Sequence, residues 1–329
     1  MSRIVRFNQT GSPEVLQIVD EVVAPPTKNE VQIKVRAIGL NRAESMYRTG
    51  LYLEAPKLPS RIGYEASGEI TAIGEGVTAF KIGDAVSTIP AFSMNQYGSY
   101  GELVNMPVHA VAQKPSNLSW EESAAIWMQY TTAYGALIEI ANIQAGDFVL
   151  ITAASSSVGV ASIEIANLIG AIPIAVTRKS DKKDALLKLG AKYVIASEEQ
   201  DIVQEVNKIT NNKGARVVFD PVAGPMINKL ADATSPHGII FQYGALSTEP
   251  TPLPLFAILG KQITIRGYTL FDLTSDAARL SRAKQFVIEG VSSGKLKPII
   301  AKTFPFEQIV AAHHYMESNQ QIGKIVVTL

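Results

Sequence analysis

The stretch FVLITAASSSVGVASIEIANLIGAIPIAVTR, residues 148–178, decides the fold of this chain. Its first four residues, Phe148 to Ile151, form a continuous apolar run of the kind that a strand buried on both faces requires. From Val158 onward, apolar residues recur at helical spacing until Gly170, a residue type that commonly ends a helix. A second apolar run follows at residues 172–176. The stretch therefore predicts a strand, a tight turn, a helix and a second strand, which together make one βαβ unit.

The turn of this unit is a candidate site for a diphosphate. The first backbone N–H groups of a helix have no partner within the helix, and they attract an anion. Dinucleotide-binding turns carry the pattern G-x-G-x-x-G, whereas residues 154–159 read ASSSVG and keep only the last glycine. A βαβ crossover that binds nothing has the same overall pattern, so the turn alone leaves both interpretations open.

The composition narrows the class of function. The chain has 329 residues, enough for two domains, and 47% of them are hydrophobic, enough for two cores. Its 30 basic and 30 acidic residues balance, so no bulk charge attracts nucleic acid. No apolar run is long enough to span a membrane. The chain has no cysteine, hence no disulfide, thiolate nucleophile or cysteine-ligated zinc, and we expect a cytoplasmic protein that binds neither nucleic acid nor membrane.

The order of strand-like and helix-like runs indicates two domains. Residues 1–122 contain short strand-like runs separated by glycine and proline, as in a compact, mostly β domain. Strands and helices then alternate, which predicts a doubly wound parallel sheet in residues 123–267. Strand character returns in residues 268–329. We therefore expect a discontinuous catalytic domain, residues 1–122 and 268–329, interrupted by a Rossmann-type domain at residues 123–267.

A helix is expected to begin after Ser119. Ser119 and Glu122 have the spacing of a capping box, in which each side chain accepts the other residue's backbone N–H. The residues expected to share one face of this helix are Trp120, Ala124, Ala125, Met128 and Thr132.

Seven short segments, taken in their order and spacing, point to a known family. They are GLNRAE (39–44), RTGLY (48–52), IGYEASG (62–68), FKIGDAV (80–86), TTAYG (131–135), FDPVAG (219–224) and GKI (323–325). On these segments the chain resembles the medium-chain dehydrogenase/reductase superfamily over essentially its whole length, and within it the zinc-free quinone oxidoreductase branch. The resemblance implies an α/β fold with a Rossmann-type, doubly wound parallel sheet and a mostly β, GroES-like catalytic domain.

The same resemblance separates this chain from the zinc alcohol dehydrogenases. Asn41 and Met128 stand where those enzymes place ligand cysteines, and Tyr64 stands where they place a ligand histidine. Asparagine, methionine and tyrosine do not supply the three N, S or O ligands that a catalytic zinc needs. We therefore expect no metal site, and a zinc alcohol dehydrogenase is the least favoured alternative.

The resemblance places Ala154, Ser156 and Gly159 at the three glycine positions of the dinucleotide turn. Serines at 156 and 157 depart from that pattern, because a side chain there stands close to the backbone that approaches the diphosphate. We expect the backbone N–H groups of Ser157, Val158 and Gly159 to point at the diphosphate. The alternative is a purely structural loop with weak binding.

The residue that follows the second strand of the βαβ unit distinguishes NAD from NADP. Enzymes that use NAD need a carboxylate there to bind the ribose 2′-OH, whereas this chain has Arg178. A guanidinium can pair with a 2′-phosphate through two hydrogen bonds, so we predict NADP as the cofactor. Lys182 matches a lysine that the branch uses at the same phosphate. The alternative is a solvated charge cluster at the start of a helix.

The resemblance also nominates residues around the nicotinamide. They are Asn41, Thr132, Tyr243, Gly244, Ala245, Tyr268, Leu270 and Lys324. Tyr243 and Tyr268 are equally consistent with aromatic residues of a core.

The expected reaction is hydride transfer to a quinone or an α,β-unsaturated carbonyl compound. The cofactor supplies the hydride, and the protein orients the acceptor and stabilises the negative charge that forms on it. The resemblance nominates Tyr52 as a proton donor, since a phenol with a pKa of about 10 is protonated at neutral pH. Asn41 and Tyr64 complete the candidate catalytic set. The alternative for Tyr52 is an exposed or packed loop aromatic.

The main alternative function is an NADPH-binding sensor or regulatory protein with little turnover. We also expect a homodimer, because members of this branch extend their coenzyme-domain sheets across a dimer interface. The alternating run at residues 262–267 is the candidate edge strand.

Overall fold

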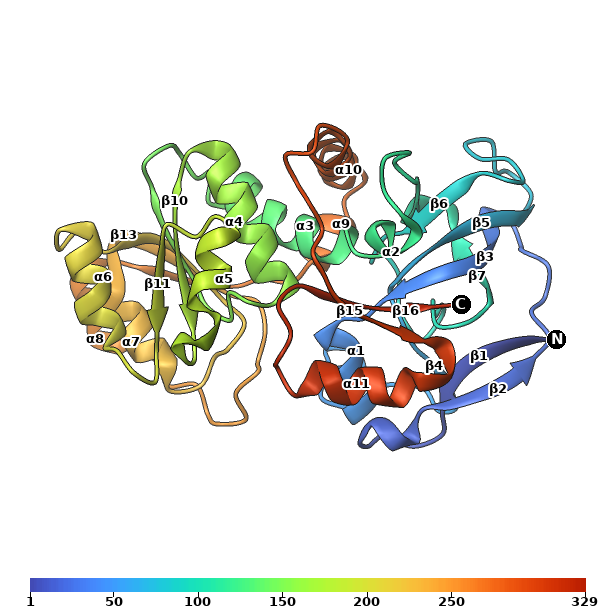
Figure 1. The fold of residues 1–329 in the computed structure, drawn as a ribbon, viewed down its shortest axis with the longest axis horizontal. Coiled ribbons are helices and arrows are strands. Elements are labelled where there is room, and N and C mark those ends of the chain that lie inside the picture. The colour runs from blue at the N-terminus through green and yellow to red at the C-terminus, as the bar shows by residue number, and fades with distance from the viewer. The chain divides into compact units, whose positions relative to one another are not determined.

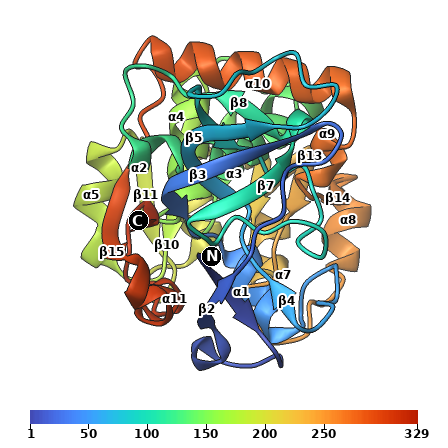
Figure 2. The ribbon, with the colours of Figure 1, turned by 90° about the vertical axis from the view of Figure 1, so that its right-hand side faces the viewer.

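The computed structural model describes residues 1–329. The chain divides into two compact units. The first unit consists of residues 1–128 and 274–329, and the second unit consists of residues 129–273. Figures 1 and 2 label most of their helices and strands. None of the helices combines the length and the apolar character that crossing a bilayer requires.

The first unit is mainly β. Its strands are β1 (Ser2–Phe7), β2 (Gln17–Glu21), β3 (Glu30–Gly39), β4 (Ser60–Arg61), β5 (Glu65–Ile73), β6 (Ala85–Thr88), β7 (Leu103–Pro107), β8 (Val111–Gln113), β15 (Ile300–Pro305) and β16 (Lys324–Thr328). Its helices are α1 (Arg42–Thr49), α2 (Trp120–Ser123), α10 (Ala277–Ser292) and α11 (Ile309–Glu317).

These strands form two sheets. A seven-stranded sheet has the order β15-β16-β3-β5-β6-β8, with β7 paired to β3, and a three-stranded sheet has the order β2-β1-β4. Strand β16, near the end of the chain, pairs with β3 near its beginning, with Val326 opposite Gly39 (Figure 1). The C-terminal segment therefore completes a sheet that the N-terminal segment begins.

The capping box at the start of α2 is confirmed. Ser119 Oγ accepts the N–H of Glu122 at 3.1 Å, and the Glu122 carboxylate accepts the N–H of Ser119 at 2.8 Å. The helix nevertheless spans only four residues, and Ser67 Oγ donates to the carbonyl oxygen of Trp120 at 2.6 Å.

A separate helix, α3 (Trp127–Tyr134), begins where the buried Glu65 carboxylate accepts the N–H groups of Trp127 at 2.9 Å and Met128 at 3.0 Å. A carboxylate at this position satisfies two of the unpaired donors of a helix N-terminus. The prediction of one continuous helical face was therefore wrong for the set Trp120, Ala124, Ala125, Met128 and Thr132.

The second unit is built on a six-stranded parallel sheet. Its strands are β9 (Phe148–Ile151), β10 (Ile172–Thr177), β11 (Tyr193–Ala196), β12 (Ala215–Asp220), β13 (Thr234–Gln242) and β14 (Thr264–Gly267). Its helices are α4 (Ser157–Ile169), α5 (Lys183–Lys188), α6 (Ile202–Thr210), α7 (Met226–Ala233), α8 (Leu255–Lys261) and α9 (Phe271–Thr274), with a π-helix at Gly135–Ile140.

The order of these strands is β11-β10-β9-β12-β13-β14, and every neighbouring pair is parallel. The predicted Rossmann-type, doubly wound sheet is therefore confirmed. Leu150 of β9 lies between Ile174 of β10 and Val218 of β12, and all three are buried, as the apolar runs require. The winding reverses between β9 and β12, and such a switch point is where open α/β sheets bind ligands, beyond the carboxyl ends of the strands.

Candidate functional site

The turn between β9 and α4 lies at this switch point. Ser156 is the N-cap of α4, and its Oγ accepts the backbone N–H of Gly159 at 3.1 Å. The Gly159 N–H is therefore engaged, and the expected set of three open N–H groups is corrected to two. The N–H groups of Ser157 and Val158 find no acceptor within the chain. They are available to an anion at the N-terminus of a 13-residue helix.

Gly159 is required by close packing. A Cβ at this position would lie 2.6 Å from the carbonyl oxygen of Ala154, which is closer than side chains approach backbone atoms. Ala154 is fully buried, so α4 begins in direct contact with the chain that leaves β9. Close packing of helix on strand is also the role of the third glycine in a dinucleotide-binding turn. The side chains of Ser156 and Ser157 are half-buried.

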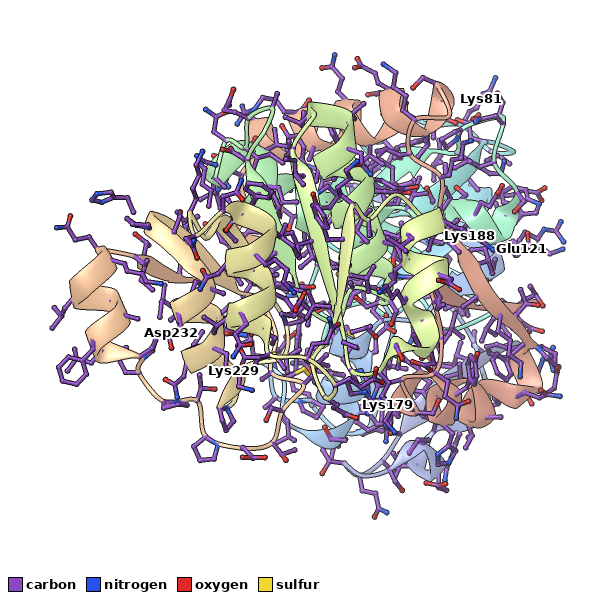
Figure 3. All side chains as sticks on the ribbon, turned by 60° about the vertical axis from the view of Figure 1, so that its left-hand side comes forward. Lys81, Glu121, Lys179, Lys188, Lys229 and Asp232 are labelled. Atoms are coloured by element: carbon purple, nitrogen blue, oxygen red, sulfur yellow. The ribbon has the colours of Figure 1, made fainter.

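Two basic residues belong to the same region. Arg178 directly follows β10 and is exposed. Lys182 Nζ donates to Ser155 Oγ at 3.2 Å, which ties the segment after β10 to the turn after β9. Burial, together with the nearby charge of Arg178, lowers the pKa of Lys182. Lys179 adds a further exposed charge (Figure 3). The structure thus brings Arg178, Lys182 and the turn into one positively charged region.

The segment after β13 also lies at the carboxyl edge of the sheet. The Tyr243 ring stacks on Phe219, with 4.0 Å between centroids and 19° between planes. Burial raises the pKa of Tyr243 well above its ordinary value, and its buried hydroxyl has no hydrogen-bond partner. A Cβ at Gly244 would lie 2.9 Å from the carbonyl oxygen of Pro221, and Ala245 is exposed. An unpaired buried hydroxyl at a ligand-binding edge is a group that a ligand can satisfy.

Three other predicted residues of the second unit are buried. Thr132 on α3 is buried, and so are Tyr268 and Leu270. Tyr268 makes an edge contact with Phe241, with 6.0 Å between centroids. Its hydroxyl occupies the space beside Gly135, where a Cβ would lie 2.2 Å from it. Packing therefore accounts for the position of Tyr268.

Asn41 and Lys324 meet in the interior of the first unit. Lys324 is only 1% exposed, and its ammonium contacts the Asn41 Oδ1 and the Glu65 carboxylate. Asn41 Nδ2 donates to the carbonyl oxygen of Gly39 at 3.2 Å and to Glu44 at 3.2 Å. These two residues were expected beside the nicotinamide. Their polar atoms are engaged within the protein, where the Lys324 ammonium is the counter-charge of the buried Glu65 carboxylate.

Two buried carboxylates, Glu44 and Glu65, were not among the predicted site residues. Glu44 accepts the N–H of Asn41 at 2.6 Å, the N–H of Tyr64 at 3.0 Å and the O–H of Tyr100 at 2.6 Å. Burial raises the pKa of Glu44. The spacing N-x-x-E at residues 41–44 is that of a capping box, and it is the sequence signal that marks Glu44.

Tyr52 and Tyr64 lie close enough for each to affect the pKa of the other. Tyr64 is fully buried, and its ring contacts Phe92 with 5.5 Å between centroids. Tyr52 is half-buried. Burial raises the pKa of both phenols above the ordinary value. Both hydroxyl groups are therefore protonated at neutral pH, and each can donate a hydrogen bond.

The donor groups of the chain do not fit a zinc ion. Asn41 is engaged by Lys324, Tyr64 offers a buried phenol, and Met128 offers only a thioether. No group of three or more His, Asp or Glu side chains in the chain is arranged to hold a metal ion. Catalytic zinc is bound by three such side chains or by cysteines, and the residues at these positions do not provide that ligand set.

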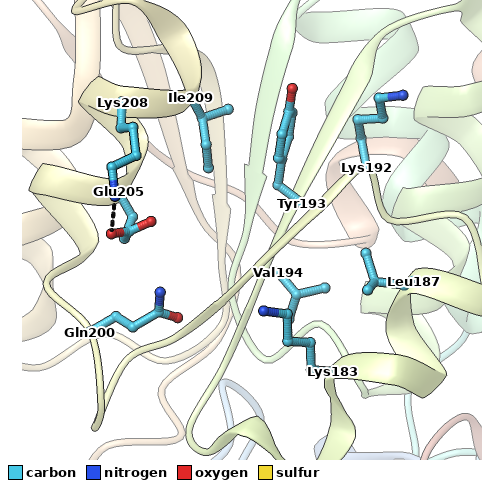
Figure 4. Close-up of a pocket in the computed structure, with 9 residues that line it drawn as sticks. All are labelled: Lys183, Leu187, Lys192, Tyr193, Val194, Gln200, Glu205, Lys208 and Ile209. Atoms are coloured by element: carbon cyan, nitrogen blue, oxygen red, sulfur yellow. Dashed lines mark hydrogen bonds and ion pairs between the residues drawn. The ribbon is translucent and has the colours of Figure 1, made fainter.

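A cavity of about 470 Å³ lies elsewhere on the second unit, beside the edge strand β11. It is lined by Lys183, Leu187, Lys192, Tyr193, Val194, Gln200, Glu205, Lys208 and Ile209 (Figure 4). Lys208 and Glu205 form an ion pair at 3.0 Å in its wall. None of the predicted site residues lines this cavity, so it is separate from the candidate site.

Two segments of the chain match described domain families. Residues 27–116 match the alcohol dehydrogenase GroES-like domain. Residues 157–287 match the family described as zinc-binding dehydrogenase.

Comparisons with whole proteins extend over nearly the entire chain. The quinone oxidoreductase of Pongo abelii is 32% identical over 332 residues, which covers 100% of this chain and 98% of that protein. The crystal structure of Escherichia coli quinone oxidoreductase complexed with NADPH has a TM-score of 0.91 at 29% identity and covers 99% of this chain and 100% of its own. The crystal structure of the CurK enoyl reductase has a TM-score of 0.88 at 26% identity and covers 99% of each chain.

Proposed function

Because the chain belongs to the quinone oxidoreductase branch of the medium-chain dehydrogenase/reductase superfamily, as its sequence predicted, we propose that it is an NADPH-dependent, zinc-independent reductase of quinones or α,β-unsaturated carbonyl compounds. The observation that carries the proposal is the open N-terminus of α4 beside Arg178 and Lys182. This region offers backbone donors for a diphosphate and two cations for a further phosphate group.

The second unit supplies the groups that would hold the cofactor. The N–H groups of Ser157 and Val158 would bind the diphosphate, and Arg178 and Lys182 would bind the 2′-phosphate. Tyr243 contributes a buried hydroxyl without a partner in the chain. NADPH, when bound, supplies the hydride.

The first unit supplies a proton donor. Addition of hydride to the β-carbon of an enone leaves negative charge on the carbonyl oxygen, and a proton must follow. Tyr52 holds its proton at neutral pH because burial raises its pKa. Tyr64, which lies close enough to affect the pKa of Tyr52, would act as a positioning residue for the Tyr52 hydroxyl. Asn41 is a second positioning residue, because it donates to Glu44, which in turn accepts the backbone N–H of Tyr64.

A substrate panel tests the proposal. Purified protein is mixed with NADPH and, separately, with a benzoquinone, an enal, an enoyl thioester and a saturated ketone, and NADPH oxidation is followed. We expect turnover of the quinone or of an unsaturated carbonyl compound and none of the saturated ketone. Thermal stabilisation by NADPH without turnover of any acceptor would instead identify a binding protein. Oxidation of simple alcohols with NADP would identify the alcohol dehydrogenase alternative.

We further propose a homodimer formed through β14 and α8. β14 ends the six-stranded sheet, so one of its edges is free. The helix that precedes it in the chain, α8, exposes Leu255 (48%), Phe256 (87%) and Leu259 (65%). Edge pairing of two β14 strands would satisfy the free backbone groups and cover this apolar face. Sedimentation of the wild type as a dimer, and of Phe256→Glu as a monomer, supports this interface, whereas a monomeric wild type contradicts it.

The remaining expectations concern location and partners. The absence of cysteine supports a cytoplasmic location. The balance of 30 basic and 30 acidic residues supports a small-molecule substrate rather than nucleic acid.

A further inference from the structure

The cavity beside β11 lies where the parallel sheet ends. β11 pairs only with β10, so one of its edges has no neighbouring strand. In Figure 4, α6 lies on one side of β11 and α5 on the other, and both helices contribute residues to the lining. The volume of about 470 Å³ falls within the range of small-molecule sites, which is about 300–1,000 Å³. The cavity is therefore large enough for a small organic molecule.

The lining of this cavity carries an excess of positive charge. Glu205 is its only carboxylate, and Lys208 already pairs with it at 3.0 Å. Lys183 and Lys192 also line the cavity, and their ammonium groups form no ion pair within the chain. Two positive charges without a counter-charge therefore belong to one cavity, and they attract an anion.

Gln200 adds a hydrogen-bond donor whose orientation is fixed. Its Oε1 accepts the backbone N–H of Ala196 at 3.0 Å, so the oxygen of the amide is held against β11. The Nε2 group has no acceptor within the chain, and it carries two N–H donors. The polar groups of the cavity that remain available are therefore donors, which an anionic ligand can satisfy.

Apolar side chains form the rest of the wall. Leu187 of α5 is 39% exposed, Ile209 of α6 is half-buried, and Val194 of β11 is buried. Covering the exposed part of these side chains with an apolar group is favourable, because it removes apolar area from water. The cavity thus fits an anion that carries an apolar body better than it fits a bare ion.

We propose that this cavity is a second ligand site, which binds a phosphate monoester with an apolar organic group. Such a phosphate carries a charge of about −1.5 to −2 at neutral pH, which matches the two lysines without a carboxylate partner. Lys183, Lys192 and Gln200 donate to the phosphate oxygens, and Leu187 and Ile209 contact the organic group. The site does not depend on the proposed function, because none of the predicted cofactor-binding residues lines the cavity.

Titration calorimetry with 1-naphthyl phosphate tests the site. NADP is present in excess throughout, so that the region around Arg178 and Lys182 does not compete for the probe. We expect one molecule of 1-naphthyl phosphate to bind per chain. Inorganic phosphate should bind about tenfold more weakly, since it buries no apolar area. 1-Naphthol, which lacks the phosphate, should show no measurable binding.

Four variants locate the binding site. Lys183→Met and Lys192→Met keep an apolar side chain and remove the charge, and each should weaken binding of 1-naphthyl phosphate by about tenfold, the loss of a hydrogen bond to a charged group. Leu187→Ser should weaken binding of 1-naphthyl phosphate and leave that of inorganic phosphate unchanged. Lys188→Met, at an exposed lysine of α5 outside the lining, is the matched control and should change neither affinity.

Several results would overturn the site. Binding of 1-naphthyl phosphate only in the absence of NADP would place the probe in the cofactor region and leave the reductase proposal intact. Equal affinities for 1-naphthyl phosphate and inorganic phosphate, or equal losses in Lys188→Met and Lys183→Met, would show a general attraction to surface charge. Absence of binding with or without NADP would overturn the site as well. Turnover of quinones or enones is measured separately, and none of these results decides it.

Discussion

The Lys324 ammonium contacts the Glu65 carboxylate, and these partners are 259 residues apart in the chain. Their side chains are 1% and 0% exposed. The same carboxylate also accepts the N–H groups that begin α3. In a buried pair of this kind the attraction between the charges offsets their desolvation only while both are present.

Lys324→Met is therefore expected to lower the free energy of unfolding by about 3–5 kcal/mol, the usual effect of leaving one buried charge without its partner. Urea denaturation measures the change. Lys34→Met, at an exposed lysine of β3, is the matched control and should change stability by less than about 0.5 kcal/mol. An equally small change in the free energy of unfolding for Lys324→Met would show that the buried Glu65 carboxylate does not need Lys324 as its counter-charge.

Arg178→Ala is expected to weaken NADPH binding by about 1.5–3 kcal/mol, the contribution of hydrogen bonds to a charged group. NADH lacks the 2′-phosphate, so its affinity should hardly change. Equilibrium titration of both nucleotides provides the measurement. Lys188→Ala, on the exposed surface of α5 (Figure 3), is the control and should affect neither. Equal losses for the two nucleotides would remove Arg178 from the 2′-phosphate site.

Ser156→Ala removes the oxygen that caps α4 and is expected to lower the free energy of unfolding by about 1 kcal/mol. Ser156→Gly should cost only a few tenths of that amount, since glycine is itself an acceptable N-cap. Ser157→Ala, one residue along the turn and without a capping bond, is the control. Urea unfolding should show the wild type as the most stable protein, followed by Ser156→Gly and then Ser156→Ala. A more stable Ser156→Ala than Ser156→Gly would contradict the capping role.

Tyr52→Phe is expected to lower kcat for an enal by about 10²-fold, at the lower end of the range for general acid catalysis. The value of kcat for a readily reduced quinone should fall by less, because reduction of a quinone depends less on a proton donor in the protein. The raised pKa of Tyr52 also predicts no loss of enal reduction between neutral pH and the ordinary tyrosine pKa of about 10, since a general acid acts in its protonated form. Tyr193→Phe, at the surface of the second unit, is the control.

His313 is completely buried with both ring nitrogens unpaired, and burial followed by the charges of Arg48 and Arg42 lowers its pKa from 6.5 to about 3. Above pH 6.5 the His313 side chain is neutral in both the folded and the unfolded protein, so its ionisation does not lower the free energy of unfolding. Below that pH only the unfolded form binds the proton, and stability falls by up to about 1.4 kcal/mol per pH unit until the pH approaches 3.

His313→Phe should therefore reduce the loss of stability between pH 6.5 and pH 5, measured by urea denaturation at each pH. His237→Asn, at an exposed histidine with φ of 59°, keeps a residue that tolerates this backbone conformation and serves as the control. An unchanged pH dependence in His313→Phe would show that another group causes the loss.

Features that depend on neighbouring residues were predicted correctly. The apolar runs around residues 148–176 predicted the βαβ unit, because burial on both faces of a parallel sheet imposes a continuous apolar pattern. Ser119 and Glu122 predicted the cap of α2, since both partners lie within one helical turn. The order of the family segments predicted the superfamily.

Features that depend on residues distant in the chain were not predicted correctly. The gap between α2 and α3 arises because Glu65, more than 50 residues earlier in the chain, binds the N–H groups at the start of α3, and helical periodicity carries no trace of that contact. Lys324 is buried as the counter-charge of the same carboxylate, and no pattern in the sequence marks this pair.

By itself the sequence determined the architecture of the second unit and the basic residue that follows β10. Hydrophobic periodicity, helix caps and the residue after a strand can all be read from neighbouring positions in the chain. Only the tertiary structure decided which polar groups remain available to a ligand. Ser156 Oγ accepts the N–H of Gly159, Glu44 accepts four hydrogen bonds, and the leucines around Tyr52 stay in water. Burial and hydrogen-bond partnership are set by segments that meet only on folding, and these contacts determine the chemistry of each side chain.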